Sequence, residues 1–299
     1  MLIKTSKNRL RIAVQKKGRL NTESMVLLER CGLKLHANKD SLYCHCENLA
    51  IDLLFVRDDD IPGLVRNNLC DVGIVGENVL LEQQLQNTHQ AHSIIEQNLG
   101  FGRCRLSIAF PAEKNYQSIA DLQGLRIASS YPHLLADFLK KQTIAAEITT
   151  ISGSVEIAPR LDMADAICDL VSTGRTLEEN NLVEVLCVMQ SQAVLIRAPQ
   201  ALAAEKMATL DLLLRRINGV QQAQESKYIV FHAPKSALIA IKNILPGVET
   251  PTIMHLEGMS DKVAVHLVSS EGVFWDTLEK LKAAGASSIL VLPIEKMLN

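Results

Sequence analysis

A turn rich in hydroxyl groups follows an acidic residue in the stretch 165–177. The turn consists of Ser172, Thr173, Gly174, Arg175 and Thr176. Backbone N–H groups, hydroxyls and a cation within one small volume are what a phosphate monoester needs. Asp169 stands on the apolar strand before the turn, where its carboxylate can accept hydrogen bonds from vicinal sugar hydroxyls. The stretch therefore favours a ribose phosphate as ligand, although a strand-exit turn with Gly at positive φ has the same composition.

Basic residues crowd the loop after the first predicted strand. Lys16, Lys17 and Arg19 surround Gly18 in one turn. Such side chains can clamp a pyrophosphate, because they donate charge-assisted hydrogen bonds to phosphate oxygens. Solvated surface charge is the alternative interpretation. The position of the run at a predicted strand end favours the clamp.

Two acidic segments precede predicted helices. Arg57 is followed by three aspartates at 58–60 and by Pro62, a pattern typical of a helix start. A magnesium role for these carboxylates is the second interpretation. Glu156 follows the segment 152–155, which opens the helix that leads to the phosphate turn. The serines of that segment cap the helix in the simpler interpretation, and Glu156 faces the ligand in the other.

The sequence lacks the patterns of several other catalytic classes. It contains no Ser–His–Asp order, no H-x-x-x-H zinc pattern, no Walker loop and no G-x-G-x-x-G after the first strand. Displacement at an activated sugar carbon needs none of these. It requires a held phosphate, a neutralised leaving group and aligned reactants, so positioning and electrostatics supply most of the rate.

Two internal similarities predict the elements that position these groups. Residues 10–13, Leu-Arg-Ile-Ala, recur at 125–128, and residues 70–76 resemble residues 168–174. The order of strand, loop, helix and strand in each half predicts two α/β lobes with largely parallel sheets. Ligands of such sheets bind beyond the carboxyl ends of the strands, so we expect these turns to meet in one cleft. Chance similarity of short peptides is the alternative.

The last part of the chain, residues 225–299, has the pattern of a small separate domain. Its periodicity predicts strands at 228–233, 252–256, 263–268 and 288–293, with helices at 235–245 and 271–284. The order βαββαβ is the ferredoxin-like plan. Modules of this plan often bind a metabolite, and a plain packing or dimerisation domain is the alternative.

Composition limits the function classes. The chain has 299 residues, 47% of them hydrophobic, which suggests two or three domains with substantial cores. Its net charge of −2, single Trp and four Tyr argue against nucleic acid as a partner. No stretch approaches the roughly 18 apolar residues of a membrane span, so we expect no membrane partner.

The cysteines indicate a reducing compartment. There are seven, an odd number without C-x-x-C pairs, and with no signal-like N-terminal segment we expect a cytoplasmic protein. Cys44, His45 and Cys46 could suggest a metal. Alternate residues of a strand face opposite sides, so His45 would point away from both sulfurs.

Taken together, these motifs resemble the ATP phosphoribosyltransferase family. The resemblance rests on Glu156 followed by Asp165-x-x-x-Asp169-Leu170-x-x-Thr173-Gly174-x-Thr176-Leu177. It extends to Lys16-x-Gly18-Arg19-Leu20, Asp71-x-Gly73-Ile74-x-Gly76, Arg57 through Gly63, Ser130 through Leu134, Glu225 through Tyr228 and Gly285 through Leu290. The similarity covers essentially the whole chain and is that of the long, histidine-regulated form.

The resemblance implies a fold and a domain plan. The expected class is α/β, with a two-lobed, periplasmic-binding-protein-like catalytic part around a cleft and a C-terminal ferredoxin-like βαββαβ regulatory domain. Lobe I is expected at 1–104 plus about 183–224. Lobe II, with the phosphoribosyl-binding loop, is expected at 105–182, and the regulatory histidine-binding domain at 225–299.

The resemblance also implies the first step of histidine biosynthesis. In that reaction ATP and phosphoribosyl pyrophosphate give N1-(5-phosphoribosyl)-ATP and pyrophosphate, with Mg²⁺ bound mainly through substrate. Histidine is expected to bind the C-terminal domain and inhibit. Homodimers and homohexamers are expected, with the hexamer favoured in the inhibited state.

Roles for individual residues follow from the resemblance and the local chemistry. Asp169 and Glu156 are expected at the reacting ribose, and Ser172, Thr173, Gly174, Arg175 and Thr176 at its 5-phosphate. Expected at pyrophosphate or ATP are Lys16, Arg19, Arg57, Asp71, Gly73, Gly76 and Glu77. Expected at regulatory histidine, from strand ends alone, are His232, Thr252 and Ser288.

One position departs from the family pattern, and one other protein class fits the lobes. The family usually has Gly at the position of Asp162. If the backbone there needs positive φ, Asp is one of the few residues that tolerate it. Two lobes around a cleft also describe solute-binding proteins and ligand-sensing regulators, which form no product.

Overall fold

The computed structural model describes residues 8–36, 41–245, 251–270 and 275–297. The chain separates into two compact units, Met1–Leu210 and Asp211–Asn299. This division falls inside the long helix α6 (Ala204–Gln224), whereas the boundary expected from the sequence is at the end of that helix.

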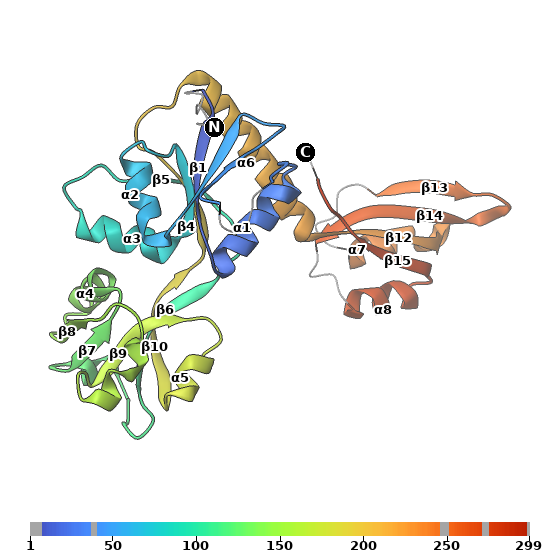
Figure 1. Cartoon of the computed structure of the whole chain (residues 1–299). Helices are drawn as coiled ribbons and strands as arrows, with labels where there is room; N and C mark the ends of the chain where they lie inside the picture. Colours follow the sequence, from blue (N-terminus) through green and yellow to red (C-terminus); the bar gives the residue numbers. More distant parts are fainter. Residues whose placement is uncertain (1–7, 37–40, 246–250, 271–274, 298–299) are drawn as a thin grey trace. The chain divides into compact units, whose positions relative to one another are not determined.

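The first unit begins with a six-stranded sheet of order β2-β3-β1-β4-β11-β5 (Figure 1). Strand β1 runs parallel to β3 and β4, and β11 runs antiparallel to β4. The strands are β1 (Leu10–Gln15), β2 (Tyr43–His45), β3 (Ile51–Val56), β4 (Val72–Gly76), β5 (Ile94–Asn98) and β11 (Ala193–Arg197). The helices beside it are α1 (Arg19–Arg30), η1 (Asp58–Asp60), α2 (Ile61–Arg66) and α3 (Glu77–Gln86).

The central parallel strand β1 is buried on both faces, as is typical of parallel strands covered by helices. Ala13 of β1 packs in one cluster with Ile61 and Val65 of α2. Its neighbours Ile12 and Val14 are fully buried as well, and alternation along a strand directs them to the opposite face. The apolar run that predicted the first strand is thus explained by a layer of helices on each side.

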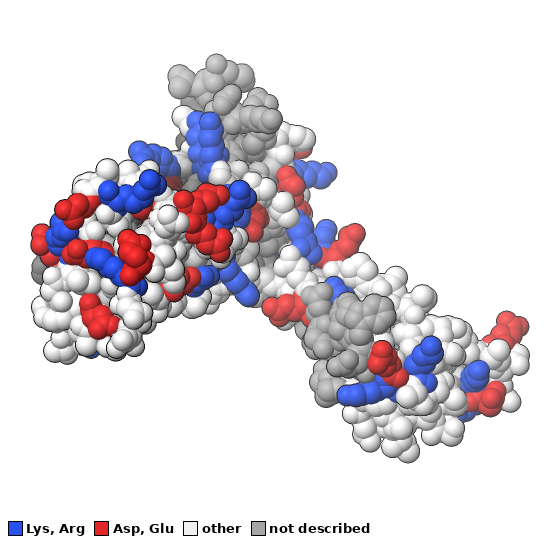
Figure 2. All heavy atoms as spheres, turned by 90° about the horizontal axis from the view of Figure 1, so that it is seen from below, with Lys and Arg blue, Asp and Glu red and all other residues white. Residues whose placement is uncertain are grey.

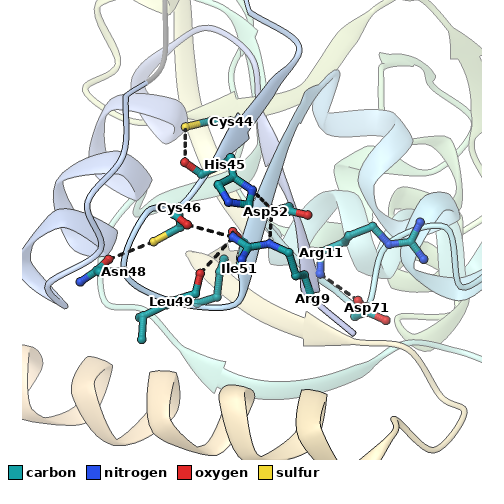
Figure 3. Close-up of polar contacts among 10 residues, drawn as sticks. All are labelled: Arg9, Arg11, Cys44, His45, Cys46, Asn48, Leu49, Ile51, Asp52 and Asp71. Carbon is teal, nitrogen blue, oxygen red and sulfur yellow. Dashed lines mark hydrogen bonds and ion pairs between the residues drawn. The ribbon is translucent and has the colours of Figure 1, made fainter. Parts of the chain in front are cut away.

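A buried ion pair closes the hairpin of β2 and β3. Figure 3 shows Arg9 donating to Asp52 at 2.7 Å, with His45 Nδ1 3.0 Å from the same carboxylate oxygen. Cys44 and Cys46 are buried, whereas half of the His45 side chain is exposed. This confirms that His45 points away from both sulfurs. Among the described residues, no group of three or more His, Cys, Asp or Glu side chains is placed to hold a metal ion.

A second sheet of the first unit has the order β10-β6-β9-β7-β8. Strands β8, β7 and β9 are mutually parallel, and β6 and β10 run antiparallel beside them. The strands are β6 (Cys104–Pro111), β7 (Arg126–Ser129), β8 (Glu147–Thr150), β9 (Ala166–Val171) and β10 (Leu182–Ser191). The helices are η2 (Ile119–Leu122), α4 (Pro132–Lys141), η3 (Val155–Ile157), η4 (Pro159–Leu161) and α5 (Arg175–Glu179).

The expected lobe boundary at about 183 needs correction. Strand β10 pairs with β6 from Leu182 to Ser191, so it belongs to the second sheet. The return to the first sheet comes with β11, which starts at Ala193. Because the pairing with β6 continues along the whole of β10, residues 182–191 belong to lobe II.

The two sheets repeat one plan, in a register different from the expected one. Ile12 lies opposite Val72, and Ile127 lies opposite Ala166. Because residues 12 and 127 correspond through the repeated Leu-Arg-Ile-Ala, strand β4 corresponds to β9. The expected match of 70–76 with 168–174 is therefore four residues out of register, and Asp71 corresponds to Asp165.

Two neighbouring chain segments join the lobes. One leads from β5 to β6 and the other from β10 to β11, and they are hydrogen-bonded to each other. Leu99 N–H donates to Ala193 O, and Ala193 N–H donates to Phe101 O, both at 2.9 Å. Gly100 and Gly102 have φ of +78° and +63°, which non-glycine residues adopt at a cost. The glycines allow the close passage of the two segments.

The second unit contains a four-stranded antiparallel sheet of order β13-β14-β12-β15. Its elements are β12 (Ser226–Pro234), η5 (Lys235–Ala237), α7 (Leu238–Ile244), β13 (Thr252–Leu256), β14 (Met259–Ser270), α8 (Trp275–Ala283) and β15 (Ser287–Pro293). In chain order this is βαββαβ, with the fourth and second strands at the edges, which is the ferredoxin-like arrangement.

This arrangement confirms the plan expected for the tail. Strand β14 begins earlier than expected, and the helix expected from 235 begins as the short 3₁₀ turn η5. Residues 271–274 of the second expected helix lie outside the described residues. One face of the sheet, with Ile229 and Phe231, packs in a cluster with Ile241 of α7 and Leu281 of α8.

Basic and acidic side chains are intermingled on the face of the protein that Figure 2 shows. No helix of the described residues is both long and apolar enough for a membrane crossing.

Gly73 of β4 tests the packing of α2 on the first sheet. A Cβ at this position would lie 2.5 Å from Ile61 Cγ2 and 3.0 Å from Val65 Cγ2. Gly73→Ala should therefore lower the free energy of unfolding by about 1–3 kcal/mol, as overpacking does. Gly63→Ala within α2 is the matched control, because its Cβ would meet nothing within 4 Å. Equal urea-unfolding midpoints for both variants would contradict the packing argument.

Candidate active site

A cavity of about 280 Å³ lies where β9 ends. It is lined by Arg19, Cys104, Glu156, Asp169, Leu170, Val171, Ser172, Thr173, Gly174, Thr176 and Leu177. Strand β9 carries Asp169 to this edge, the turn after β9 forms one wall, and η3 brings in Glu156. Seven of the residues expected at the phosphoribosyl or pyrophosphate groups thus meet in one place. Cys104, which the sequence analysis did not select, starts β6 beside them.

The turn after β9 depends on the conformation of Gly174. Its φ is +87°, and a Cβ there would meet nothing within 4 Å. Backbone strain, not space, is therefore what favours glycine. Thr173 Oγ1 accepts a long hydrogen bond of 3.5 Å from the N–H of Arg175. Helix α5 starts at Arg175, and the first N–H groups of a helix have no partner within the helix, so the turn can donate to an anion.

Asp169 is a half-buried carboxylate without a cationic partner among the described residues. Burial raises its pKa to about 6, and the negative charge of Glu156 acts in the same direction. The backbone N–H of Leu170, which donates to Asp169 Oδ1 at 2.8 Å, opposes the shift. A carboxylate held in this way binds hydroxyl groups or positive charge strongly, because it gains interactions that replace the lost water.

The basic residues expected at phosphates separate into two groups. Arg19 lines the cavity and donates to the carbonyl oxygen of Arg103 at 3.1 Å. Lys16 and Arg57 do not line it, and the Arg57 side chain is 82% exposed. Arg175 also stays outside the lining, since its Nε donates to Glu179 at 2.8 Å within α5. The turn thus faces the cavity through its backbone and hydroxyls.

A smaller cavity of about 230 Å³ lies at the segments that join the lobes. Glu77, Arg103, Gln190, Ser191 and Gln192 line it. Glu77 starts α3 directly after Gly76 ends β4, so both lie at the carboxyl end of that strand as expected. Arg103 is a cation that sequence reasoning missed, because nothing near it marks a strand end.

Asp71 and Gly73, which are also expected at pyrophosphate or ATP, do not line either cavity. Asp71 precedes β4, and its carboxylate accepts from Lys206 Nζ at 2.8 and 2.9 Å. It also accepts from the N–H of Arg11 at 2.8 Å (Figure 3). Amino ends of parallel strands lie opposite the ligand edge. Gly73 is buried under α2.

The second lobe repeats this arrangement with Asp165. The N–H of Arg126 donates to Asp165 Oδ2 at 3.0 Å, as Arg11 does to Asp71. Hydrogen bonds from the Arg126 side chain and N–H lower the pKa of Asp165 to about 2. Asp162 has φ of +56°, so the positive φ considered for this position is confirmed.

Two polar contacts fix the lobes against each other. The carboxylate of Glu82 on α3 accepts from the N–H groups of His133 and Leu134, at the start of α4, at 2.9 and 2.8 Å. Asn78 of α3 donates to Tyr131 Oη at 3.1 Å. A larger and mainly apolar cavity of about 610 Å³ lies between α3, α4 and β10. None of the expected site residues lines it.

The residues expected at regulatory histidine lie on three strands of the second unit. His232 of β12 pairs with Ser287, the neighbour of Ser288, on β15. Thr252 starts β13, which is separated from β12 by β14. The structure therefore brings His232 and Ser288 onto adjacent strands and leaves Thr252 farther along the sheet.

Fold and site together define a two-lobed α/β protein with a polar cavity at its strand ends and a C-terminal ferredoxin-like domain, the expected fold class. Residues 57–219 match the family model described as ATP phosphoribosyltransferase, and residues 223–296 match that of its C-terminal domain. The chain belongs to the ATP phosphoribosyltransferase family, in its long form. It is a transferase of histidine biosynthesis, so the solute-binding alternative is wrong.

A solved structure of an ATP phosphoribosyl transferase complex agrees with this assignment. A chain of an ATP phosphoribosyl transferase (HisG:HisZ) complex from Thermotoga maritima is 25% identical, with a TM-score of 0.57, over 70% of this chain and 98% of that one. A periplasmic binding protein from Brucella ovis with glutathione bound is 10% identical, with a TM-score of 0.47, over 73% and 70% of the two chains. The second similarity carries no argument, and the two-lobed plan rests on the strand orders.

The raised pKa of Asp169 predicts that Asp169→Asn stabilises the protein near pH 8. The folded pKa of about 6 exceeds the unfolded value, which is about 3.9. Ionised Asp169 therefore costs stability as pH rises through this window, and Asn does not.

Thermal unfolding between pH 4 and 8 measures the effect. The Tm advantage of the variant should be largest at pH 8 and shrink toward pH 4. A Tm at pH 8 that is unchanged or lower than that of the wild type would contradict the assigned cause of the shift.

Proposed function

We propose that this protein transfers the 5-phosphoribosyl group of phosphoribosyl pyrophosphate to N1 of the adenine of ATP. The products are N1-(5-phosphoribosyl)-ATP and pyrophosphate, in the first step of histidine biosynthesis. The observation that carries the proposal is the meeting of Asp169, Glu156 and Arg19 in one cavity with four residues of the turn, namely Ser172, Thr173, Gly174 and Thr176. Membership of the chain in the ATP phosphoribosyltransferase family supports it.

In this proposal the turn after β9 holds the 5-phosphate. Ser172, Thr173, Gly174 and Thr176 line the cavity with hydroxyls and backbone N–H groups. Arg175 contributes its N–H, since its guanidinium is paired with Glu179. Arg19 is the cation nearest to the pyrophosphate, and Lys16 and Arg57 act only on substrate groups that extend beyond the cavity. Glu77 lines the smaller cavity, and Gly76 precedes it at the carboxyl end of β4, on the side proposed for the nucleotide.

The two carboxylates favour the transition state in this scheme. When pyrophosphate departs from the anomeric carbon, positive charge develops on the ribose, and Asp169 and Glu156 stabilise it electrostatically. Asp169 also accepts from the ribose hydroxyls, which fixes the sugar. The adenine N1 lone pair attacks the anomeric carbon as the bond to pyrophosphate breaks. N1 is unprotonated at neutral pH, so no strong general base is needed.

Magnesium is part of the proposal as a substrate-bound ion. The cavity offers two carboxylates, Asp169 and Glu156. The described residues supply no cluster of three or more potential ligands. Mg²⁺ usually retains several waters and binds substrate phosphates together with one or two carboxylates, which this pair fits. The ion would neutralise charge on the pyrophosphate leaving group.

We further propose that histidine, the end product, binds the ferredoxin-like domain and inhibits, with His232, Thr252 and Ser288 as candidate contacts. The Thermotoga chain is matched by only 70% of this one, which leaves the tail available for a separate role. Homodimers and homohexamers belong to the same proposal. A cytoplasmic location is supported by the seven free cysteines, which suit a reducing compartment.

Asp169→Asn should lower kcat/KM for phosphoribosyl pyrophosphate by about 100-fold or more, the loss typical of one strong polar transition-state contact. Product formation is followed by ultraviolet absorbance after mixing with ATP, phosphoribosyl pyrophosphate and Mg²⁺. Asp162→Asn is the matched control, because its side chain is 96% exposed and lies outside the cavity. Unchanged kinetics of Asp169→Asn would remove this residue from the mechanism.

A chain ended after Gln224 should remain catalytically active and lose inhibition by histidine. The cut falls at the end of α6 and removes the whole βαββαβ domain. The same absorbance assay, repeated over a range of histidine concentrations, compares the shortened and full chains. If the shortened chain is still fully inhibited, histidine binds elsewhere.

A further inference from the structure

Arg105 on β6 is held by an acidic partner on the neighbouring strand. Its Nε and Nη2 donate to the two carboxylate oxygens of Glu184 on β10, in a bidentate pair. Ser107 Oγ also donates to this carboxylate, at 2.8 Å. The hydrogen bonds from Arg105 hold the pKa of Glu184 below its usual range. A paired, planar guanidinium of this kind has one fixed orientation.

The remaining nitrogen of this guanidinium contacts the phosphoribosyl-binding turn. Arg105 Nη1 donates to the carbonyl oxygen of Ser172 at 3.4 Å. Ser172 is the first residue after β9 and is exposed. In a trans peptide the C=O of Ser172 and the N–H of Thr173 point in opposite directions. A carbonyl oxygen held by Arg105 therefore directs the N–H of Thr173 away from Arg105.

The orientation of this peptide matters to an anion. If the peptide turned over, the Ser172 carbonyl oxygen would take the place of the Thr173 N–H, and a phosphate there would meet an acceptor instead of a donor. The wall formed by Ser172, Thr173 and Gly174 would then repel the group it is proposed to bind. Rotation of this peptide changes only ψ of Ser172 and φ of Thr173, so a contact that holds the Ser172 carbonyl oxygen constrains its orientation directly.

We propose that Arg105, oriented by Glu184, is a positioning residue that locks the Ser172–Thr173 peptide in the phosphate-binding orientation. This inference rests on the proposed phosphoribosyl site. Arg105 does not line the cavity, and Glu184 neutralises its charge. Its effect is thus on the direction of a backbone donor and not on the charge of the site. The two residues were not among those selected from the sequence.

The variant Arg105→Lys tests this positioning role in the full-length protein. A lysine has one nitrogen and cannot hold Glu184 in a bidentate pair while donating to Ser172. We expect KM for phosphoribosyl pyrophosphate to rise about tenfold or more, as for loss of a charge-assisted hydrogen bond. The KM for ATP should stay unchanged, and kcat should stay within about threefold, because the carboxylates at the ribose are untouched. An unchanged KM for phosphoribosyl pyrophosphate overturns the proposal.

Arg126→Lys is the matched control in the same lobe. Arg126 also pairs with a carboxylate, Asp165, and donates to a carbonyl oxygen, that of Asp162 at 2.8 Å. It lies at the amino end of β7, away from the cavity lining. This variant should lose comparable thermal stability and keep its KM for phosphoribosyl pyrophosphate. A rise in that KM equal to the Arg105→Lys effect would make the effect a general loss of stability and overturn the proposal.

The double variant Arg105→Glu with Glu184→Arg separates positioning from a merely structural ion pair. It restores the pair, and with it the Tm, but residue 105 then has no hydrogen to donate to Ser172. We expect the KM for phosphoribosyl pyrophosphate to stay raised. Full kinetic recovery would show that the pair serves stability alone.

Binding of ribose 5-phosphate, measured by calorimetry, distinguishes failure of this inference from failure of the proposed reaction. If the wild type forms no product but binds ribose 5-phosphate, and Arg105→Lys binds it about tenfold more weakly, the proposed reaction is wrong and the positioning role of Arg105 is supported. If the wild type binds neither ribose 5-phosphate nor phosphoribosyl pyrophosphate, the turn is not a phosphate site, and the positioning role of Arg105 is overturned with it.

Discussion

The parallel pairing of β7 with β9 decides where the cavity lies. It brings the carboxyl end of β9 to one edge of the second sheet, so that Asp169 and the turn 172–176 emerge together. The short helix η3 reaches the same edge, so Glu156 lines the cavity together with Asp169 and the turn. The remaining features of the site, including the raised pKa of Asp169 and the orientation of the turn, are consequences of this placement.

Acidic residues at the two edges of the sheets have opposite electrostatic environments. At the amino edges, Asp71 and Asp165 each accept the N–H of an arginine on the adjacent strand and pair with a cation. Their charges are satisfied and contribute to stability. At the carboxyl edge, Asp169 is partly desolvated, near Glu156, and its pKa is raised. A carboxylate that costs stability in this way is typical of a residue retained for function.

The lobes are joined by more than the two crossing segments. Glu82 accepts from the first N–H groups of α4, and Asn78 reaches Tyr131. A carboxylate at a helix N-terminus is favourable because of the helix dipole and the free N–H groups. Since Arg19 belongs to the first lobe and Asp169 to the second, the cavity is complete only while the lobes keep this arrangement. These contacts therefore belong to the architecture of the site.

The sequence by itself determined the local features. The βαββαβ order of the tail, the turn after β9, the opposed directions of His45 and its flanking cysteines, and the positive φ at Asp162 were all predictable. Each depends on neighbours in the chain, through strand alternation, helix periodicity or the conformational range of a single residue. Membership in the family was likewise carried by contiguous motifs.

The tertiary structure alone decided which residues meet. Asp71 and Asp169 look alike in sequence, but strand register puts the first beside Lys206 and the second in the cavity. Strand β10 stays in the second lobe because it pairs with β6. The link from Arg105 to Ser172 joins segments far apart in the chain. Register and pairing between distant strands come from packing of whole layers, so no local pattern records them.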